Sequence, residues 1–241
     1  MIEKLLVEYE DKYNFSFVFI LTAMITFFIG VFTFFTFNHP YVLVGLLALA
    51  LSYPTIRHLT KEEKDLDKLK TIFKSFDFFR KELMIYSSIF CGFSAGLFLL
   101  FVFKLVDDLS IFETIISSVT GQFILGENFV GILSNNLMVG VLTFTLSVIM
   151  FSGFLFVLSW NASILAYYLA YVANDKFYTL IAILPHLIFE IGGFILAGLA
   201  GNILMYGIEY KKNKLKFAKI SLFVLFFAAL FILIGAFLET V

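Results

Sequence analysis

A histidine and a glutamate four residues apart, His186 and Glu190, are the side chains of this sequence best placed to do chemistry. Both stand within a long apolar stretch, where ionisable groups are costly and usually face the protein interior. In a helix, a spacing of four puts them on one face. The pair could relay protons or cations. Alternatively, Glu190 could accept hydrogen bonds from His186, or from amides exposed near Pro185, and lock a kinked helix.

Small residues continue the face that carries this pair. They are Gly193, Ala197 and Gly201, and a matching stripe of alanines stands earlier in the chain, at Ala162, Ala166 and Ala170. Small residues at this spacing let two membrane helices approach closely. We therefore expect these two helices to pack together, with Asn161 or Asn202 as hydrogen-bond partners of the polar groups. A further pair, Gly92 and Gly96, is expected to pack within the chain rather than to form a dimer.

Enzyme signatures are missing from the sequence. The other two histidines, His39 and His58, stand near opposite ends of one apolar segment, and no HExxH motif, phosphate-binding loop or nucleophile elbow occurs. The single cysteine, Cys91, rules out a cysteine-based metal site and a disulfide within the chain. The sequence thus predicts a non-enzymatic protein, with no catalytic residue, no metal site and no cofactor.

The elements that hold these residues are predicted from hydropathy. Of the 241 residues, 61% are hydrophobic, against roughly half in soluble domains, and they fall into blocks long enough to cross a bilayer. These blocks predict an all-α fold, a polytopic transmembrane helical bundle of about seven segments. Their expected ranges are 15–37, 40–56, 83–106, 137–159, 162–173, 177–208 and 217–238. The partner this composition implies is the lipid bilayer, and no nucleic acid is expected.

Two of these segments are expected to be short or broken. Trp160 and Asn161 interrupt a run of apolar residues that would otherwise be too long, and Pro185 is the natural breaking point of 177–208. If the short helix 162–173 and its neighbour form a re-entrant pair, five segments cross rather than seven. The predicted divisions are an N-terminal transmembrane hairpin (1–57), a cytoplasmic amphipathic connector (58–82) and a five-helix membrane core (83–241). The connector could instead be a solvated charged linker.

Charge predicts how the chain is threaded. Of the 17 basic residues, two lie in the N-terminal tail, eight between Arg57 and Lys81, and five between Lys211 and Lys219. The segment 107–136 has four acidic residues and no basic one. By the positive-inside rule, the lysine-rich connections are cytoplasmic. We expect a multi-pass protein of the cell membrane with a cytoplasmic N-terminus and an external C-terminus.

Three stretches of the sequence resemble the stage II sporulation protein M family. The longest is Ile183-Leu-Pro-His-Leu-Ile-Phe-Glu-Ile-Gly-Gly-Phe-Ile-Leu-Ala-Gly-Leu-Ala-Gly201, which has the family's Pro-His, its Glu four residues after the His, and its small-residue tail. The others are Asn135-Asn136-Leu-Met-Val139 and Asn161 before a small-residue helix, although Asn161 lacks the Gly that commonly follows in the family. The resemblance implies a five-helix core and singles out Asn135, Asn136, Asn161, Pro185, His186 and Glu190.

The resemblance also implies a type of function. The named member of the family, from spore-forming bacteria, is a non-enzymatic membrane protein that helps to position cell-wall-remodelling partners. We therefore expect a scaffold or assembly factor that recruits other membrane or envelope proteins. The rival hypothesis is a small transporter or permease subunit that uses His186 and Glu190 at a site between broken helices. Association of the chain with itself stays open, and the sequence identifies neither a substrate nor a particular partner.

Overall fold

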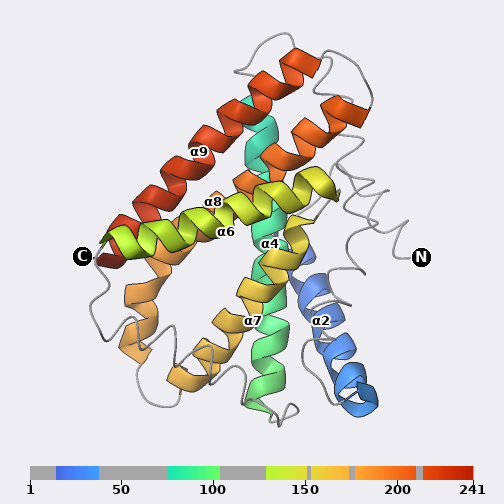
Figure 1. Cartoon of the computed structure of the whole chain (residues 1–241). Helices are drawn as coiled ribbons and strands as arrows, with labels where there is room; N and C mark the ends of the chain where they lie inside the picture. Colours follow the sequence, from blue (N-terminus) through green and yellow to red (C-terminus); the bar gives the residue numbers. More distant parts are fainter. Residues whose placement is uncertain are drawn as a thin grey trace.

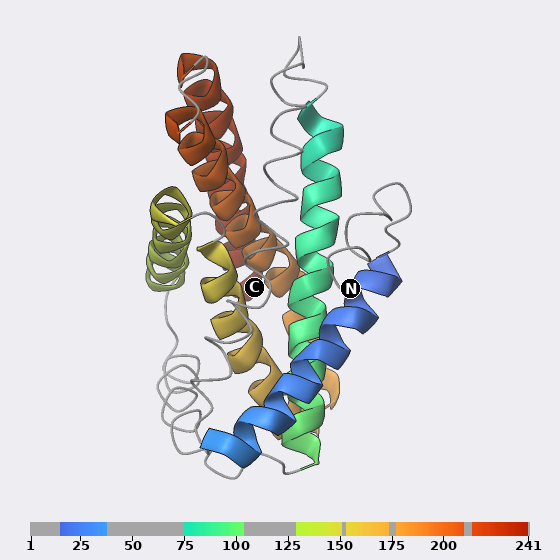
Figure 2. The ribbon, with the colours of Figure 1, turned by 90° about the vertical axis from the view of Figure 1, so that its right-hand side faces the viewer.

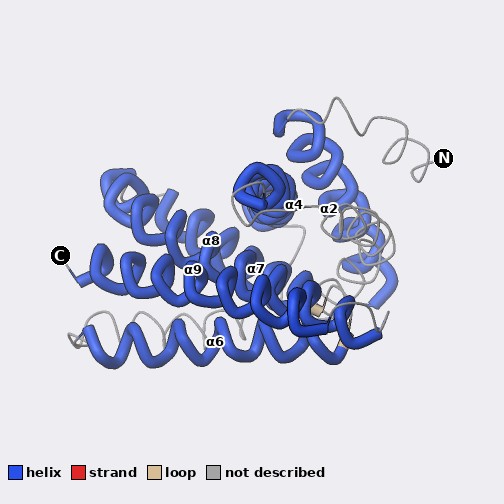
Figure 3. The backbone as a smooth tube through the Cα atoms, turned by 90° about the horizontal axis from the view of Figure 1, so that it is seen from above, coloured by secondary structure: helices blue, strands red, loops and turns tan. Residues whose placement is uncertain are grey.

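The computed structural model describes residues 15–37, 75–103, 129–150, 153–173, 177–209 and 214–240. Within these ranges every element is an α-helix, which confirms the predicted all-α fold (Figure 3). The helices are α2 (Phe15–Phe37), α4 (Ser75–Val102), α6 (Phe129–Ile149), α7 (Phe154–Ala173), α8 (Phe177–Glu209) and α9 (Lys214–Thr240). The predicted segment 40–56 and residues 58–74 of the predicted connector lie outside the described residues, while the connector's last residues, 75–82, form the start of α4.

Four of these helices are long and apolar enough to cross a membrane. The spans are Leu83–Val102 within α4, Phe129–Ile149, Leu184–Ile208 within α8, and Lys214–Thr240. Shorter apolar stretches lie within α2 and α7, at Phe19–Phe32 and Phe154–Ala170. A bilayer core of about 30 Å needs about 20 helical residues, so the four long spans suffice by length and composition.

The helices form two groups. Helices α8 and α9 make an antiparallel hairpin that α6 crosses, while α4 lies between α2 and α7 (Figures 1 and 2). The groups meet where α4 and α7 contact α8. Their shared core contains Phe93, Phe154, Leu158 and Ile195, all of them almost fully buried. A second buried cluster, which includes Ala197, Phe217 and Val224, packs α8 against α9.

The buried face of α6 consists of polar or small residues, and its large apolar residues are exposed or half-buried. The buried residues of α6 are Asn136, Gly140, Thr143 and Ser147, and the large exposed ones include Val130, Met138, Val141 and Leu142. In water this arrangement would expose apolar surface and desolvate polar groups at once, whereas hydrocarbon solvates the exposed face. Helix α2 repeats the pattern, because Thr22, Thr26 and Gly30 are buried while Met24 and Phe28 are exposed. This reversal is typical of helices packed in a bilayer.

The interruption predicted at Trp160 and Asn161 is wrong in position. Helix α7 runs through both residues, and the break lies earlier, between the end of α6 at Ile149 and the start of α7 at Phe154. The amide of Met150 still donates to Leu146, and the amide of Gly153 donates to Met150 in a tight turn. A Cβ on Gly153 would lie 2.4 Å from the Leu146 carbonyl oxygen, so only glycine fits there. The predicted segments 137–159 and 162–173 are therefore replaced by α6 and α7.

Pro185 does not end a helix either. It lies inside α8, which is helical for 33 residues, and the ribbon changes direction near its crossing with α6 (Figure 1). At about 1.5 Å per residue, α8 is about 50 Å long, more than the apolar core of a bilayer requires. A proline removes one backbone hydrogen bond without terminating a helix whose neighbours hold it in place.

The glycine pair of α4 packs within the chain, as predicted. A Cβ on Gly92 would lie 2.8 Å from the Phe19 carbonyl oxygen, and one on Gly96 would lie 2.6 Å from that of Ala23. Both oxygens belong to α2, so the backbones of α2 and α4 touch at these two glycines (Figure 2). The first described helix is thereby fixed against the rest of the bundle.

Candidate functional site

Glu190 lies where three helices meet. The Nδ2 atom of Asn136, on α6, donates a 2.5 Å hydrogen bond to Oε1 of Glu190, on α8. On the other side α9 touches Glu190 through Gly235, where an added Cβ would lie 2.6 Å from Cγ of Glu190. A hydrogen bond to an intramembrane carboxyl group can offset part of the cost of removing it from water. Glu190 therefore contacts both α6 and α9, and ties them to α8.

The expected hydrogen-bond donors to Glu190 are replaced by this one. His186 was the first predicted donor and Asn161 a predicted partner, but Asn161 donates 2.8 Å to the Val157 carbonyl of its own helix. His186 lies near Glu190, but within the described part of the chain no hydrogen bond from its imidazole to that carboxyl group is found. Asn136 of α6 supplies the bond instead. Only the family resemblance had singled out this residue.

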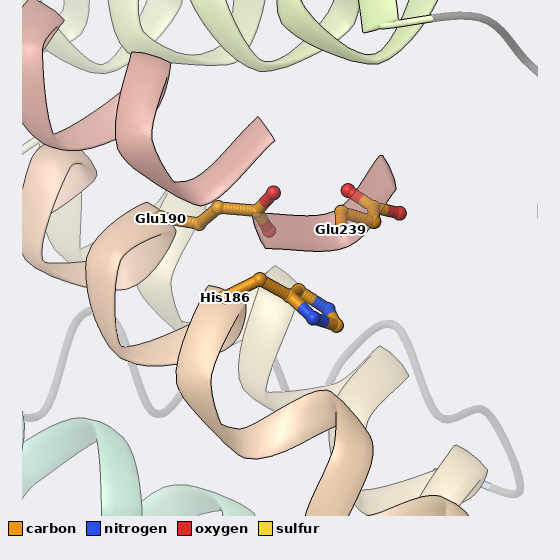
Figure 4. A group of neighbouring side chains, drawn as sticks. All are labelled: His186, Glu190 and Glu239. Carbon is orange, nitrogen blue, oxygen red and sulfur yellow. The ribbon is translucent and has the colours of Figure 1, made fainter. Parts of the chain in front are cut away.

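A second carboxyl group joins the pair from the end of α9. One ligand atom from each of His186, Glu190 and Glu239 lies within 4.8 Å of the others. Figure 4 shows the three side chains gathered between α8 and the last turns of α9. His186 is buried, and the two glutamates are half-buried. Glu239 was not predicted from the sequence, where its only signal is that it is the sole acidic residue on α9.

Helices α7 and α8 contact each other, as predicted, but the small-residue stripe of α8 does not face α7 at its two glycines. Gly193 lies against α9, where an added Cβ would be 3.0 Å from the Ala228 carbonyl oxygen. Gly201 lies against α6, where the corresponding distance to the Phe144 carbonyl oxygen is 2.5 Å. Ala197 is buried in the α8–α9 cluster. The stripe thus contacts both α9 and α6. The contact of α8 with α7 is made by Gly198, which lies next to Ala197 of the stripe.

The remaining residues singled out by sequence lie apart from this cluster. Asn135 is exposed, although its neighbour Asn136 is buried. Pro185 is exposed on α8 next to His186. Asn202, the other predicted partner, is fully buried three turns beyond Glu190 on α8. The structure therefore gathers Asn136, His186 and Glu190 from the predicted set, and adds Gly235 and Glu239.

This arrangement has the chemistry for holding a cation or a proton. Carboxylate oxygens and an imidazole nitrogen are ligands for divalent metal ions, and neighbouring carboxyl groups can also share a proton. The described residues of the cluster include neither a cysteine nor a serine. The cluster can thus clasp helices, bind an ion or pass a proton.

Comparison with known proteins gives one match. The family model for stage II sporulation protein M matches residues 83–241, which include the α4 span and all of α6, α7, α8 and α9. Helix α2 precedes the matched range. No curated protein and no solved structure matches this chain.

Proposed function

The chain belongs to the stage II sporulation protein M family, and we propose that it is a non-enzymatic membrane scaffold or assembly factor that recruits other membrane or envelope proteins. The observation that supports this role is the position of Glu190. Its carboxyl group is engaged by Asn136 of α6 and covered by Gly235 of α9. A polar group used to fasten three helices together suits a rigid platform.

The partners would meet this platform through its outward apolar faces. On α6, Met138 is 74% exposed, and on α9, Phe226 is 65% exposed. Apolar surface at bilayer depth can contact either lipid or another membrane protein. The proposal requires at least one such face to hold a protein partner rather than lipid alone.

Site-specific photo-crosslinking in native membranes tests this role. A photoreactive amino acid is placed at Met138 in one variant and at Phe226 in another, since both side chains are exposed on different helices. We expect one face to give a discrete crosslinked protein band and the other to give mainly lipid adducts. Lipid adducts alone, at these and at further exposed positions of all six helices, would argue against recruitment.

A second candidate is a small transporter or permease subunit, which is favoured by the clustering of three ionisable groups around Glu190. Carboxyl groups inside membrane proteins often belong to ion or proton pathways. Glu190→Gln separates the two roles, because glutamine can still accept the Asn136 hydrogen bond but cannot carry a proton or a charge. Normal folded yield with loss of pH-dependent flux in proteoliposomes favours transport. An unchanged flux, or none in the wild type, favours the scaffold.

A further inference from the structure

We propose that His186, Glu190 and Glu239 bind one divalent transition-metal ion, which fastens the end of α9 to α8. The three side chains already offer ligand atoms within 4.8 Å of one another. His186 and Glu190 come from successive turns of one helix, and Glu239 comes from the other (Figure 4). One imidazole nitrogen and two carboxylate oxygens suit Zn²⁺ and neighbouring divalent ions, with water completing the coordination.

The histidine gives independent support. The side chain of His186 is only 7% exposed. The imidazole lies beside the two carboxyl groups in Figure 4. A neutral imidazole is the commonest metal ligand among protein side chains. A metal ion held among the three side chains would bind one of its ring nitrogens.

The surroundings of the carboxyl groups also fit a metal site. Asn136 donates to Oε1 of Glu190, which fixes the orientation of the carboxylate. Ligands of metal ions are commonly held in this way by a hydrogen bond from a neighbouring side chain. Two carboxylates this close repel each other when both are ionised, and a divalent cation between them removes that repulsion.

The close contact of α8 with α9 brings the third ligand into place. Gly235 lies against the backbone of α8, 3.2 Å from the amide nitrogen of Glu190 when measured from an added Cβ. Glu239 is four residues further along α9 and hence on the same helical face. A larger residue at 235 would move this face away from Glu190. The glycine therefore allows one ion to bridge the two helices.

Zn²⁺ binding to the full-length protein tests the site. The detergent-purified chain is stripped with chelator, titrated with Zn²⁺, desalted, and analysed for bound metal and for melting temperature. We expect about one Zn²⁺ per chain and a melting temperature that rises with Zn²⁺ concentration, because an ion bound only by the native state stabilises it by mass action. A protein that holds no Zn²⁺ after titration and desalting would overturn the proposal. The two carboxyl groups would then share a proton instead.

Variants distinguish this site from surface binding. Glu239→Gln removes a half-buried ligand, and we expect it to weaken Zn²⁺ binding more than about tenfold, as loss of a supporting group around a metal does. Glu209→Gln, at the other end of α8, changes charge equally and should bind as the wild type does. Equal binding by the wild type and Glu239→Gln, or equal losses in both variants, would refute the site.

Two further variants distinguish the loss of a ligand from the loss of the fold. Glu239→His replaces one ligand by another and should keep Zn²⁺ binding close to that of the wild type, whereas His186→Gln should lose it. A Glu239→His protein that folds but binds no better than Glu239→Gln would contradict the role of residue 239 as a ligand. Wild-type helicity by circular dichroism shows that each variant has kept its fold.

Discussion

At the scale of single residues, the bond between Asn136 and Glu190 is the polar contact that most directly joins two spans. It connects α6 with α8 over 2.5 Å, and both residues were singled out from sequence. Glu190 stands out because a carboxyl group is rare inside an apolar stretch. Asn136 was found through the family resemblance alone, because an asparagine near the start of an apolar run is also an ordinary helix cap.

Replacing Asn136 by leucine keeps the number and branching of the side-chain heavy atoms and removes the hydrogen-bond donor. We expect the free energy of unfolding to fall by about 1 to 2 kcal/mol, because the carboxyl group of Glu190 is left without this partner. Thermal or chemical unfolding in a fixed detergent measures the change. Asn135→Leu is the matched control, since Asn135 is exposed on the same helix and should stay within about 0.5 kcal/mol of the wild type. Equal stability of the two variants would show that the bond contributes nothing.

The third member of the cluster shows the limit of sequence reasoning about sites. Glu239 is brought to His186 and Glu190 only by the antiparallel packing of α8 and α9. Nothing in local spacing connects residues on two helices, so a motif can reveal the pair on α8 but not its partner on α9. The same reason explains why no metal site was expected from the sequence, which showed only two adjacent candidate ligands.

At the scale of helices, hydropathy located the elements well and their packing partners poorly. The ranges 15–37 and 177–208 agree with α2 and α8 to within a residue, because the contrast between apolar runs and charged residues is strong. The break between α6 and α7 was missed, since Gly153 is an ordinary residue in a membrane helix and the pair Trp160 and Asn161 interrupts the apolar run more visibly. Which glycine faces which helix depends on the rotation of each helix about its axis, which hydropathy does not record.

The contact of α9 with α8 at Gly235 can be tested by adding one methyl group. Gly235→Ala brings a Cβ within 2.6 Å of Cγ of Glu190 and close to the α8 backbone, so we expect the two helices to be forced apart. Gly140→Ala is the control, because its Cβ would meet only the flexible tip of Ile232, at 2.8 Å. Both changes improve helix propensity equally. The difference between them therefore reports packing.

We expect Gly235→Ala to be less stable than Gly140→Ala by about 1 to 3 kcal/mol, the usual cost of overfilling a packed contact. The two proteins are compared by thermal unfolding in the same detergent. A Gly235→Ala protein as stable as the Gly140→Ala protein would mean that α8 and α9 are more loosely packed at residue 235 than the structure shows.

At the scale of the whole molecule, the orientation of α9 decides on which side of the membrane Glu239 lies. Its 27 residues span about 40 Å, which exceeds the bilayer core. Lysines Lys214, Lys216 and Lys219 lie in its first turns, and Glu239 lies in its last turn. By the positive-inside rule, we expect the lysine end to lie in the cytoplasm. The cluster around Glu190 and Glu239 would then lie toward the outer surface, where external divalent ions could reach it.

Cysteine labelling of intact cells tests this orientation. In a Cys91→Ser background, one variant carries Lys214→Cys and another Thr240→Cys, two exposed positions at opposite ends of α9. A membrane-impermeant maleimide should label residue 240 in intact cells and residue 214 only after the cells are opened, because the helix is too long for both ends to lie on one side. The Cys91→Ser parent gives the background. Labelling of residue 214 alone in intact cells would reverse the threading and place the ionisable cluster next to the cytoplasm, where it would meet the low free Zn²⁺ of the cell interior.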